Sequence, residues 1–353
     1  MKKKITVTVP KLTSPGGVSS FWNALLPEFI KFEDLDLTVL EIGGHRKNAL
    51  GPIIDQWNFS KFKNRDVDLV ILNPSLGFRS FFRDVLFAKQ LVKKKVPFVV
   101  FFHGWNLDFE KKVDVKYSRL FLGSLGKAEK IFVLSSDFKK KLQQWGYKGD
   151  IIIQTTTVNN NLLKDIEYNQ DFKINEELSI LFLSRLLKEK GVYETIAAFR
   201  GIKKNNPGIQ LIIAGEGKEY SNLESLIRND NDILMVGHVE GKEKIRLFKK
   251  CHVYCLPSYS EGLPTSVLEA MAFGIPVITT RVGGLNDFFK DGEMGYLVEP
   301  KNVKQLEYKL SALISNKDLL VKIGEFNYQY AHNNIISPIV AKRFYKQILE
   351  VLS

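Results

Sequence analysis

The sequence has few cysteines and no long apolar run. Cys251 and Cys255 are the only cysteines among 353 residues, and no second Cys/His pair accompanies their Cys-x3-Cys spacing to complete a zinc site. They lie in or beside an apolar segment, so we interpret them as small core thiols in a reducing compartment. Apolar runs such as 96–102 are far shorter than the ~20 residues that a membrane-crossing helix needs. The composition argues against both a disulfide framework and an integral membrane protein.

The start of the sequence also lacks the features of an export signal. Met1 and three lysines are followed directly by the alternating residues 5–9, without the apolar region or cleavage site of a signal peptide. Long polar stretches are missing as well, and 44% hydrophobic with 25% charged residues supports a chain that is globular throughout. We expect a cytoplasmic protein, with a peripheral position on the inner face of the plasma membrane as an alternative.

Acidic residues are scarce in the first half of the chain. Residues 1–165 hold 27 Lys/Arg against 16 Asp/Glu, whereas residues 166–353 hold 24 against 23, so almost all of the net charge of +12 is N-terminal. A strongly basic N-terminal half predicts contact with an anionic membrane surface, a phosphorylated lipid or nucleic acid. A solvated lysine-rich surface is the plain alternative. No recognised nucleic-acid-binding module accompanies the charge, so we expect no nucleic-acid partner.

Short β-branched runs alternate with helix-length segments along the whole chain. This alternation is typical of parallel-sheet α/β units, and the length suits two domains. Two helical stretches end the sequence, at 318–332 and 338–352. The predicted strands are 5–9, 35–42, 67–72, 96–102, 130–134, 151–155, 179–183, 210–214, 233–236, 253–256 and 276–279.

We place the domain boundary in a polar segment with weak apolar periodicity, residues 159–177. The sequence then divides into an N-terminal Rossmann-like domain, residues 1–165, and a C-terminal one, residues 166–337. We expect the final helix, at about 338–353, to pack back on the N-terminal domain. The predicted fold class is α/β, with two doubly wound parallel sheets.

The segment after strand 253–256 combines two carboxylates with a helix start. Pro264 is suited to begin a helix, whose free N–H groups favour phosphate, and Gly262 lets the backbone approach a ligand. Glu261 precedes that helix and Glu269 falls in its second turn. Carboxylates accept hydrogen bonds from the vicinal hydroxyls of ribose or hexose. A capped helix with two surface glutamates is the alternative.

These residues and the following Ala-Met-Ala-x-Gly-x-Pro-Val resemble the E-x7-E signature of family 4 glycosyltransferases. The resemblance implies the GT-B fold, two Rossmann-like domains facing across a cleft, and a reaction that retains anomeric configuration. It implies that Glu261 contacts the donor sugar and Glu269 the nucleotide ribose. Contacts with sugar and phosphate are implied for the backbone of a short loop, Gly262, Leu263, Pro264 and Thr265.

Two cations follow the first strand of the C-terminal half. Arg185 and Lys190 stand five residues apart, which resembles the family's diphosphate-binding pair. They would stabilise the leaving nucleoside diphosphate, a task that a metal ion performs elsewhere. Lys188, between them, is assigned to solvent. The alternative is an ordinary basic loop.

His103 stands at the end of a buried strand and is followed by a glycine. A lone histidine is more often a packed or surface residue, but this position resembles the family's active-site histidine, which contacts the donor sugar. We expect it to face the cleft. His238, with Val239, has a weaker claim, near the nucleotide base through its backbone.

Glycines mark two further strand ends. The pair Gly16 and Gly17 lacks the spacing of a dinucleotide fingerprint, and it better matches the family's N-terminal Gly-Gly loop, which approaches donor and acceptor. Gly215 and Glu216, followed by another glycine, resemble the family's turn near the nucleotide. A simple tight turn is the alternative for the second motif.

No metal site and no cofactor are expected, apart from the nucleotide sugar as co-substrate. Two Asp-x-Asp pairs, at 34–36 and 66–68, formally match the metal-binding motif of a different transferase class. Both pairs precede their strands, so we place them at the sheet end opposite the cleft and interpret them as strand-entry turns.

Two basic-aromatic segments could touch a membrane, residues 78–95 and 107–125. Basic-aromatic helices can lie on anionic lipid. For 78–95, packing on its own sheet is the better interpretation. For 107–125, with Phe109, Val113, Leu120 and Phe121 among four cations, we favour membrane contact.

The sequence therefore predicts a metal-independent retaining glycosyltransferase. It would move a hexose-type sugar from a nucleoside diphosphate sugar to a hydroxyl of a glycan or polyprenyl-diphosphate-linked acceptor, in bacterial surface polysaccharide or lipopolysaccharide synthesis. A sugar-nucleotide epimerase or hydrolase of the same fold, and a non-catalytic membrane-associated sugar-nucleotide binding protein, are the alternatives. Donor, acceptor, linkage and oligomeric state stay open.

Overall fold

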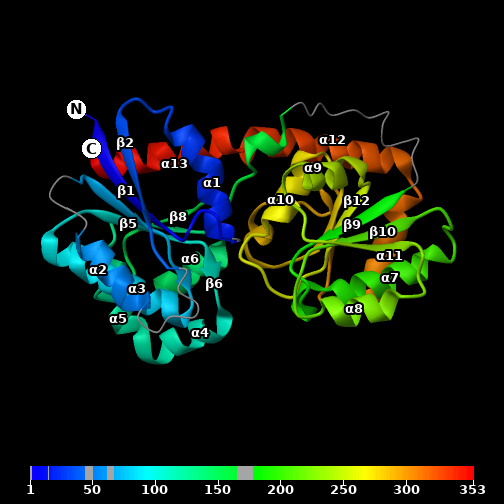
Figure 1. Cartoon of the computed structure of the whole chain (residues 1–353), viewed down its shortest axis with the longest axis horizontal. Helices are drawn as coiled ribbons and strands as arrows, with labels where there is room; N and C mark the ends of the chain where they lie inside the picture. The colour runs from blue at the N-terminus through cyan, green and yellow to red at the C-terminus, as the bar shows by residue number, and fades with distance from the viewer. Residues whose placement is uncertain (1, 15, 44–50, 62–66, 165–177) are drawn as a thin grey trace. The chain divides into compact units, whose positions relative to one another are not determined.

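A computed structural model describes the chain except residues 1, 15, 44–50, 62–66 and 165–177. The described residues form two compact units (Figure 1). The first combines Met1–Asn159 with Ser337–Ser353, and the second is Asn160–Ile336. The predicted boundary at 165/166 and most of the predicted linker lie outside the described residues.

A parallel sheet organises the first unit. Its strand order is β2-β1-β3-β5-β7-β8, and β3 and β5 are buried along their whole length. Continuous apolar strands of this kind are expected where helices cover both faces of a sheet. The strands are β1 (Lys3–Val9), β2 (Leu35–Glu41), β3 (Leu69–Leu72), β5 (Phe98–Phe102), β7 (Lys130–Val133) and β8 (Asp150–Ile153).

Several strands of this sheet begin or end away from their predicted limits. The strand predicted at 96–102 begins at Phe98, since Pro97 has no N–H to give to the ladder. The strand predicted at 67–72 begins at Leu69. Asp68 precedes it and bonds to Lys4 of β1 through both its carboxylate and its backbone N–H, each at 2.8 Å. Two short strands, β4 (Ser75–Leu76) and β6 (Gly104–Trp105), form a separate pair that the periodicity did not predict.

The helices of this unit include the last one in the chain. The aromatic ring of Phe344, in this final helix, lies 4.9 Å from Phe132 and 6.2 Å from Phe21. The final helix therefore completes the core of the first unit. The helices are α1 (Gly17–Phe29), α2 (Gly51–Lys61), α3 (Phe78–Lys94), α4 (Leu107–Lys112), α5 (Ser118–Leu122), α6 (Ser136–Gln144) and α13 (Ser337–Leu352).

The segment predicted to touch a membrane, residues 107–125, is not one helix. A π-helical turn, Val113–Tyr117, separates α4 from α5. Phe109, Val113 and Phe121 are buried, and the Phe109 ring packs 5.4 Å from Phe81. The apolar side chains that suggested membrane contact are therefore largely used by the core of this unit.

A second parallel sheet, of order β11-β10-β9-β12-β13-β14, organises the other unit. Its last strand was not predicted, because Gly295–Val298 is short and lacks a β-branched run. Cys255 lies in β12 and burial raises its thiol pKa to about 12, as expected for an inert core thiol. The strands are β9 (Ser179–Leu183), β10 (Gln210–Ala214), β11 (Ile233–Gly237), β12 (Val253–Leu256), β13 (Val277–Thr280) and β14 (Gly295–Val298).

Six α-helices accompany this sheet in the described residues, and none in the described part of the chain is long and apolar enough to cross a membrane. The predicted fold class, two doubly wound parallel-sheet domains, is confirmed. The helices are α7 (Val192–Lys203), α8 (Tyr220–Ile227), α9 (Gly241–Lys250), α10 (Thr265–Ala272), α11 (Val303–Ile314) and α12 (Lys317–Asn334).

Candidate active site

The predicted donor residues of the second unit gather at one edge of its sheet. All its strands run parallel, so their carboxyl ends meet on the same side. Arg185 follows β9, Gly215 follows β10, His238 follows β11 and Glu261 follows β12. The predicted donor residues therefore come from the loops that follow four neighbouring strands.

Lys190 and Glu261 form an ion pair at this edge. The Lys190 ammonium donates to Glu261 Oε1 at 2.6 Å, and the two side chains are only 10% and 13% exposed. The two loops that carry them are tied together, since the backbone N–H of Tyr259 donates to the Glu189 carbonyl at 2.8 Å. Both residues are held in place before any ligand arrives.

Gly191 explains why the Lys190 loop can lie so close to the Glu261 loop. Its φ is +77°, and a Cβ there would stand 2.3 Å from the Pro257 carbonyl oxygen. Only glycine tolerates both the conformation and the contact. The glycine thus sets the distance between the cation and the carboxylate.

Gly262 and the start of α10 lie next to Glu261. The helix begins at Thr265, so Pro264 is its cap and not its first residue. The prediction was one residue early, because the proline carbonyl already accepts the Val267 N–H at 3.1 Å. The first N–H groups of α10, which have no partner within the helix, lie at this same sheet edge.

A glycine loop after β13 supports Gly262 and was missed by the sequence analysis. The Gly284 N–H donates to the Gly262 carbonyl at 2.7 Å, and a Cβ on Gly283 would approach that oxygen to 2.1 Å. A glycine pair in the loop after a predicted strand is the same pattern as Gly16 and Gly17. The sequence could therefore have predicted this loop as well.

Glu269 is paired with a cation from another helix. Lys244 of α9 places its ammonium 2.6 Å from both Glu269 oxygens, and Glu269 is 5% exposed. Nothing in the sequence distinguishes Lys244 from the other lysines of α9, so only the structure reveals it.

Gly215 is required by the chain itself. Its φ is +134°, and a Cβ would lie 1.9 Å from the Ser184 carbonyl oxygen. The Glu216 carbonyl accepts the Leu186 N–H at 2.8 Å, while its side chain is exposed. The tight-turn interpretation therefore explains this motif within the unit, and it holds the Arg185 loop against β10.

Three other predicted donor residues differ in exposure. Arg185 and His238 are exposed, whereas Val239 is buried. The His238 ring nitrogen Nε2 lies 2.8 Å from Glu240 Oε1. Arg185 is therefore positioned by its loop, and its guanidinium is available at the surface.

Gly16 and Gly17 mark the beginning of α1 in the first unit. The Ser20 N–H donates to the Gly16 carbonyl at 2.9 Å. The Gly16 backbone is extended, and a Cβ on Gly17 would meet no described atom within 4 Å. Contacts among the described residues thus give no reason for glycine at either position, in contrast to Gly215.

His103 lies at the end of β5 and is fixed by a hydrogen-bonded chain. Its Nε2 is 2.9 Å from Asn73 Oδ1, and Asn73 Nδ2 donates to the Thr8 carbonyl at 2.8 Å. Because the amide nitrogen of Asn73 is used by Thr8, its oxygen faces the ring, so Nε2 carries the proton. Nδ1 then keeps its lone pair.

Burial makes His103 a neutral ring. It packs against Phe101 and Phe21, with ring centroids 3.9 and 4.9 Å away. Desolvation lowers the His103 pKa to about 3, since a charged imidazolium is disfavoured in an apolar environment. At neutral pH, His103 can accept a hydrogen bond but supplies no charge.

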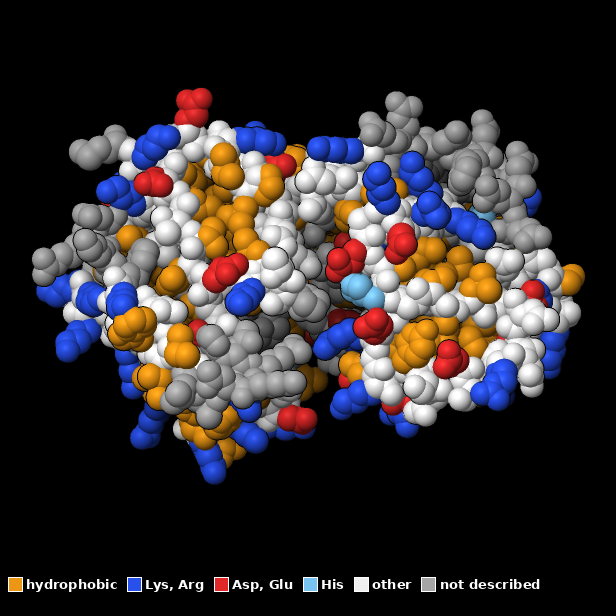
Figure 2. Space-filling model, viewed as in Figure 1, with side chains coloured by type: hydrophobic (Ala, Val, Ile, Leu, Met, Phe, Trp, Pro, Cys, Tyr) orange, Lys and Arg blue, Asp and Glu red, His pale blue; other side chains and the backbone are white. Residues whose placement is uncertain are grey.

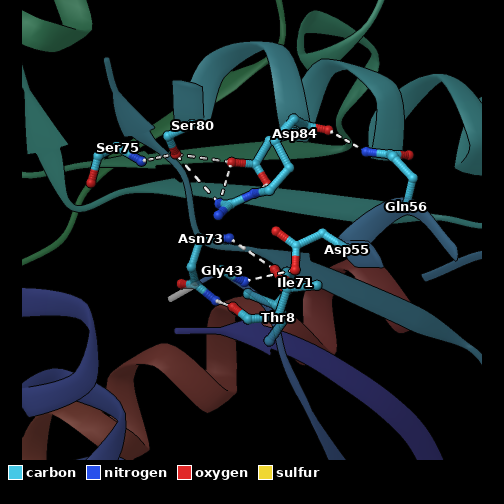
Figure 3. Close-up of polar contacts among 10 residues, drawn as sticks. Thr8, Gly43, Asp55, Gln56, Ile71, Asn73, Ser75, Ser80 and Asp84 are labelled. Carbon is cyan, nitrogen blue, oxygen red and sulfur yellow. Dashed lines mark hydrogen bonds and ion pairs between the residues drawn. The ribbon is translucent and has the colours of Figure 1, made fainter. Parts of the chain in front are cut away.

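Asn73 belongs to a polar network that the sequence analysis missed (Figure 3). It bonds to Thr8, the last polar residue of β1, while Ser80 bonds to the Ser75 backbone N–H at 3.1 Å. Figure 3 shows these groups lying together, although they come from several different elements. The network fixes the loop that holds Asn73.

An ion pair anchors the same network to α3. Arg83 donates to the fully buried Asp84 at 2.8 Å. Burial raises the Asp84 pKa, and Arg83 opposes this rise. Asp55 of α2 accepts the Gly43 N–H at 2.9 Å on the other side (Figure 3).

The Asp-x-Asp pairs make structural contacts. Asp34 accepts a hydrogen bond from the Tyr345 hydroxyl, and Asp68 binds the Lys4 backbone. Asp66 lies outside the described residues. Among the residues that the structure describes, no three His, Cys, Asp or Glu side chains are grouped to hold a metal ion.

Comparison with protein families gives one match, which lies in the second unit. Residues 164–330 match the model of glycosyl transferases group 1. This part of the chain is therefore similar to that family. Lys190, Glu261, Glu269 and the other residues gathered at the sheet edge all lie inside the matched group 1 region.

Known proteins similar to this chain agree. A glycosyltransferase of Methanocaldococcus jannaschii, MJ1178, is 30% identical over 68% of this chain and 64% of its own length. The capsular polysaccharide biosynthesis glycosyltransferase CapM of Staphylococcus aureus is 26% identical over 63% of this chain and 56% of its own length. The chain thus spans less than two thirds of these curated relatives.

Comparison with solved structures covers nearly the whole chain. The structure of HepE from Anabaena, in complex with UDP and glucose, superimposes with a TM-score of 0.72 at 14% identity, covering 98% of this chain and 99% of HepE. Such a likeness shows the fold alone, which is GT-B.

Proposed function

We propose that the protein is a retaining, family 4 glycosyltransferase. It transfers a hexose-type sugar from a nucleoside diphosphate sugar to a hydroxyl of a glycan or of a polyprenyl-diphosphate-linked glycan. The observation that carries this proposal is the Lys190–Glu261 pair, 2.6 Å apart beside the start of α10 in a group 1 region. A cation, a carboxylate and a helix N-terminus at one edge suit a ligand with both phosphates and sugar hydroxyls.

The ion pair is suited to exchange its partners for the two ends of the donor. Lys190 turns from Glu261 to the diphosphate, and Glu261 accepts hydrogen bonds from sugar hydroxyls instead. Both groups are nearly buried, so each would be costly to leave unpaired. Replacing both partners at once avoids that cost, which favours a ligand that carries both chemistries.

Glu269 accepts hydrogen bonds from the ribose hydroxyls, and Lys244 holds this carboxylate in place. The Gly262 to Thr265 backbone contacts sugar and phosphate. Turns at Gly215 and Glu216, and at His238 and Val239, border the nucleotide. Gly16 and Gly17 have no side chains and let the donor and the acceptor approach the backbone closely. This would explain why glycine stands at two positions where the contacts within the unit do not require it.

The reaction breaks the bond between the anomeric carbon and the diphosphate oxygen. The acceptor hydroxyl oxygen forms the new bond to that carbon and its proton is released to solvent, while the nucleoside diphosphate departs with one more negative charge. Arg185, Lys190 and the N–H groups of α10 stabilise that charge. These cations take the role that a metal ion fills elsewhere, so the proposed reaction is metal-independent. The Nδ1 atom of neutral His103 accepts a hydrogen bond from a hydroxyl of the donor sugar.

The similarity to CapM supports a role in bacterial surface polysaccharide or lipopolysaccharide synthesis. Such acceptors are assembled on lipid carriers, and we place the protein in the cytoplasm with its basic first unit at an anionic membrane surface. The solved structure of HepE is a complex with UDP and glucose, which makes UDP-sugars the first class to test.

The experiment is a screen of UDP-, GDP- and ADP-sugars by thermal shift and by turnover, with and without polyprenyl-diphosphate-linked acceptors. We expect one donor class to stabilise the protein and to be consumed only when an acceptor is present. Equal consumption without any acceptor would point to a hydrolase or epimerase, and stabilisation without turnover to a non-catalytic binding protein.

Variants locate the site. Lys190→Ala and Glu261→Gln should each lower kcat/KM by about 100-fold or more, the loss expected for a group that stabilises developing charge. Lys188→Ala, on an exposed lysine of the same turn, is the matched control and should stay within about twofold. Intact transfer in both site variants would refute the assignment.

A further inference from the structure

An apolar groove lies on the first unit, away from every residue assigned above. It encloses about 700 Å³ between the end of α1 and the final helix α13, a volume within the range of ligand-binding pockets. The stacked rings of Phe32 and Tyr345, 4.0 Å apart, form part of its lining. Ile339 and Leu349 of α13 add aliphatic surface.

The groove is bordered by cations from the same helix. Lys342, Arg343 and Lys346 line it, together with Lys31. The one acidic lining residue, Glu28, is already paired with Lys31 at 2.6 Å. Positive charge therefore exceeds negative charge around an apolar floor.

Helical spacing puts these groups on a single face of α13. Residues 339, 342, 343, 346 and 349 follow steps of three and four, which align side chains along one side of a helix. Ile339 is 37% exposed, and the nearby Ile30 is 78% exposed. Figure 2 shows hydrophobic side chains gathered over α1, with both basic and acidic side chains around this surface.

Two of the lysines are available for a ligand. Within the described ranges, Lys342 and Lys346 make no ion pair shorter than 4.0 Å, in contrast to Lys31 and Lys130. Lys346 lies close enough to Glu350 to help lower the pKa of that carboxyl, which is itself paired with Lys130. An exposed apolar surface with polar and charged residues at its rim marks an interaction site. A complementary ligand must be apolar in its body and anionic at its head.

We propose that this groove binds an anionic phospholipid of the membrane surface, with an acyl chain against Phe32, Tyr345 and Leu349 and the phosphate at Lys342 and Lys346. Lysine side chains suit this geometry, because their stems lie along apolar surface while the ammonium reaches the headgroup. A free phosphate would leave the apolar floor uncovered. A second copy of the chain would bring the same positive charge to the rim and be repelled.

This inference rests on the proposed function only for its purpose, which is to hold the enzyme beside a lipid-linked acceptor. It differs from the sequence-based expectation in location. The segment 107–125 also presents exposed lysines with two exposed apolar side chains, Leu107 and Val115, but its larger side chains Phe109, Val113 and Phe121 are buried. The groove differs in being a concave surface lined by aromatic and aliphatic side chains.

The test is co-sedimentation of the full chain with vesicles, either of phosphatidylcholine alone or with about one third phosphatidylglycerol. We expect binding to the anionic vesicles only, weakened by salt as surface electrostatic attraction is. Lys342→Glu/Lys346→Glu should reduce partitioning at least about tenfold, given the attraction of each basic residue to an anionic surface. Ile339→Asp should also reduce it.

The matched control reverses two exposed lysines elsewhere, Lys112→Glu/Lys116→Glu. It should bind the vesicles within about twofold of the parent protein. Circular dichroism and thermal melting verify that each variant is folded. The proposal fails if the parent does not bind anionic vesicles, if the groove variants bind as the parent does, or if the control loses as much affinity.

A donor-binding assay on the same variants separates the two proposals. The groove variants should keep the thermal shift given by the best nucleotide sugar. Loss of vesicle binding with retained donor binding supports the groove, whereas vesicle binding by a protein that responds to no nucleotide sugar would refute the proposed transferase and leave the groove standing.

Discussion

At the scale of single residues, the buried charges and rings are matched to neighbours that only the fold supplies. His103 depends on Asn73 and Phe101, and Glu269 depends on Lys244. The sequence identified His103 and Glu269 from their positions after strands and in a motif. It could not identify Asn73 or Lys244, because their types and spacing do not distinguish them from neighbouring residues.

The low pKa of His103 predicts an acid-dependent loss of stability. With a folded-state value of about 3 against 6.5 in the unfolded chain, only the unfolded state takes up a proton as pH falls from about 6.5 towards 3. Its contribution to stability is thus fully present above pH 6.5 and declines below it. His103→Gln should make the free energy of unfolding less dependent on pH in this window, measured by denaturant titration.

NMR provides the direct check on this ring. The His103 Cε1 proton should keep a constant chemical shift between pH 5 and pH 8. A titration with a midpoint near 6.5 would contradict the neutral, desolvated state. Asn73→Leu removes the hydrogen-bond partner without adding charge, and it should change the tautomer signature of the ring nitrogens.

The pair of Lys244 and Glu269 predicts a stability effect that can be rescued. Lys244→Met leaves a carboxylate that is 5% exposed without its cation, at a cost of about 3 kcal/mol or more. The double variant Lys244→Met/Glu269→Gln removes both charges and should recover most of that loss. Equal instability of the single and double variants in denaturant unfolding would contradict the pairing.

At the scale of elements, alternation predicted most strands because each buried run is apolar and is separated from the next by a helix. It failed for β4, β6 and β14, which are two to four residues long and too short to show a period. One strand limit moved at Pro97, which has no N–H to give to the sheet. Loop contacts such as Gly283 with Gly262 depend on tertiary approach, which no local pattern encodes.

The turn after β10 should not tolerate any side chain at position 215. Gly215→Ala would put a Cβ 1.9 Å from the Ser184 carbonyl at a φ of +134°, so we expect a loss of about 2 kcal/mol or more in unfolding free energy. Gly208→Ala is the control, since nothing among the described residues lies within 4 Å of a Cβ there. Equal melting temperatures of the two variants would refute this explanation of the motif.

At the scale of the molecule, the first unit is built from both ends of the sequence. The final helix was predicted to return to the N-terminal domain, and in the structure Phe344 lies among Phe21, Phe29, Phe101 and Phe132. What the sequence could not supply is the groove that this helix creates with α1, since the groove depends on how two distant segments pack.

Truncation of this aromatic side chain should affect the units unequally. Phe344→Ala opens a cavity in the first unit and should cost about 3–5 kcal/mol. In calorimetry, the transition of that unit should move to lower temperature, while stabilisation by a nucleotide sugar, which we propose binds mainly to the other unit, should persist. An unchanged thermogram would contradict the role of α13 in this core. Tyr308→Ala, on an exposed ring, is the control.

The return of α13 also sets an order for folding during synthesis. The first unit contains Met1–Asn159 but lacks part of its core until Ser337–Ser353 have been made. The continuous second unit, Asn160–Ile336, can close before that helix leaves the ribosome. The part of the protein that is translated first would then be the last to become stable, so nascent chains should expose the aromatic pocket that awaits Phe344 to chaperones.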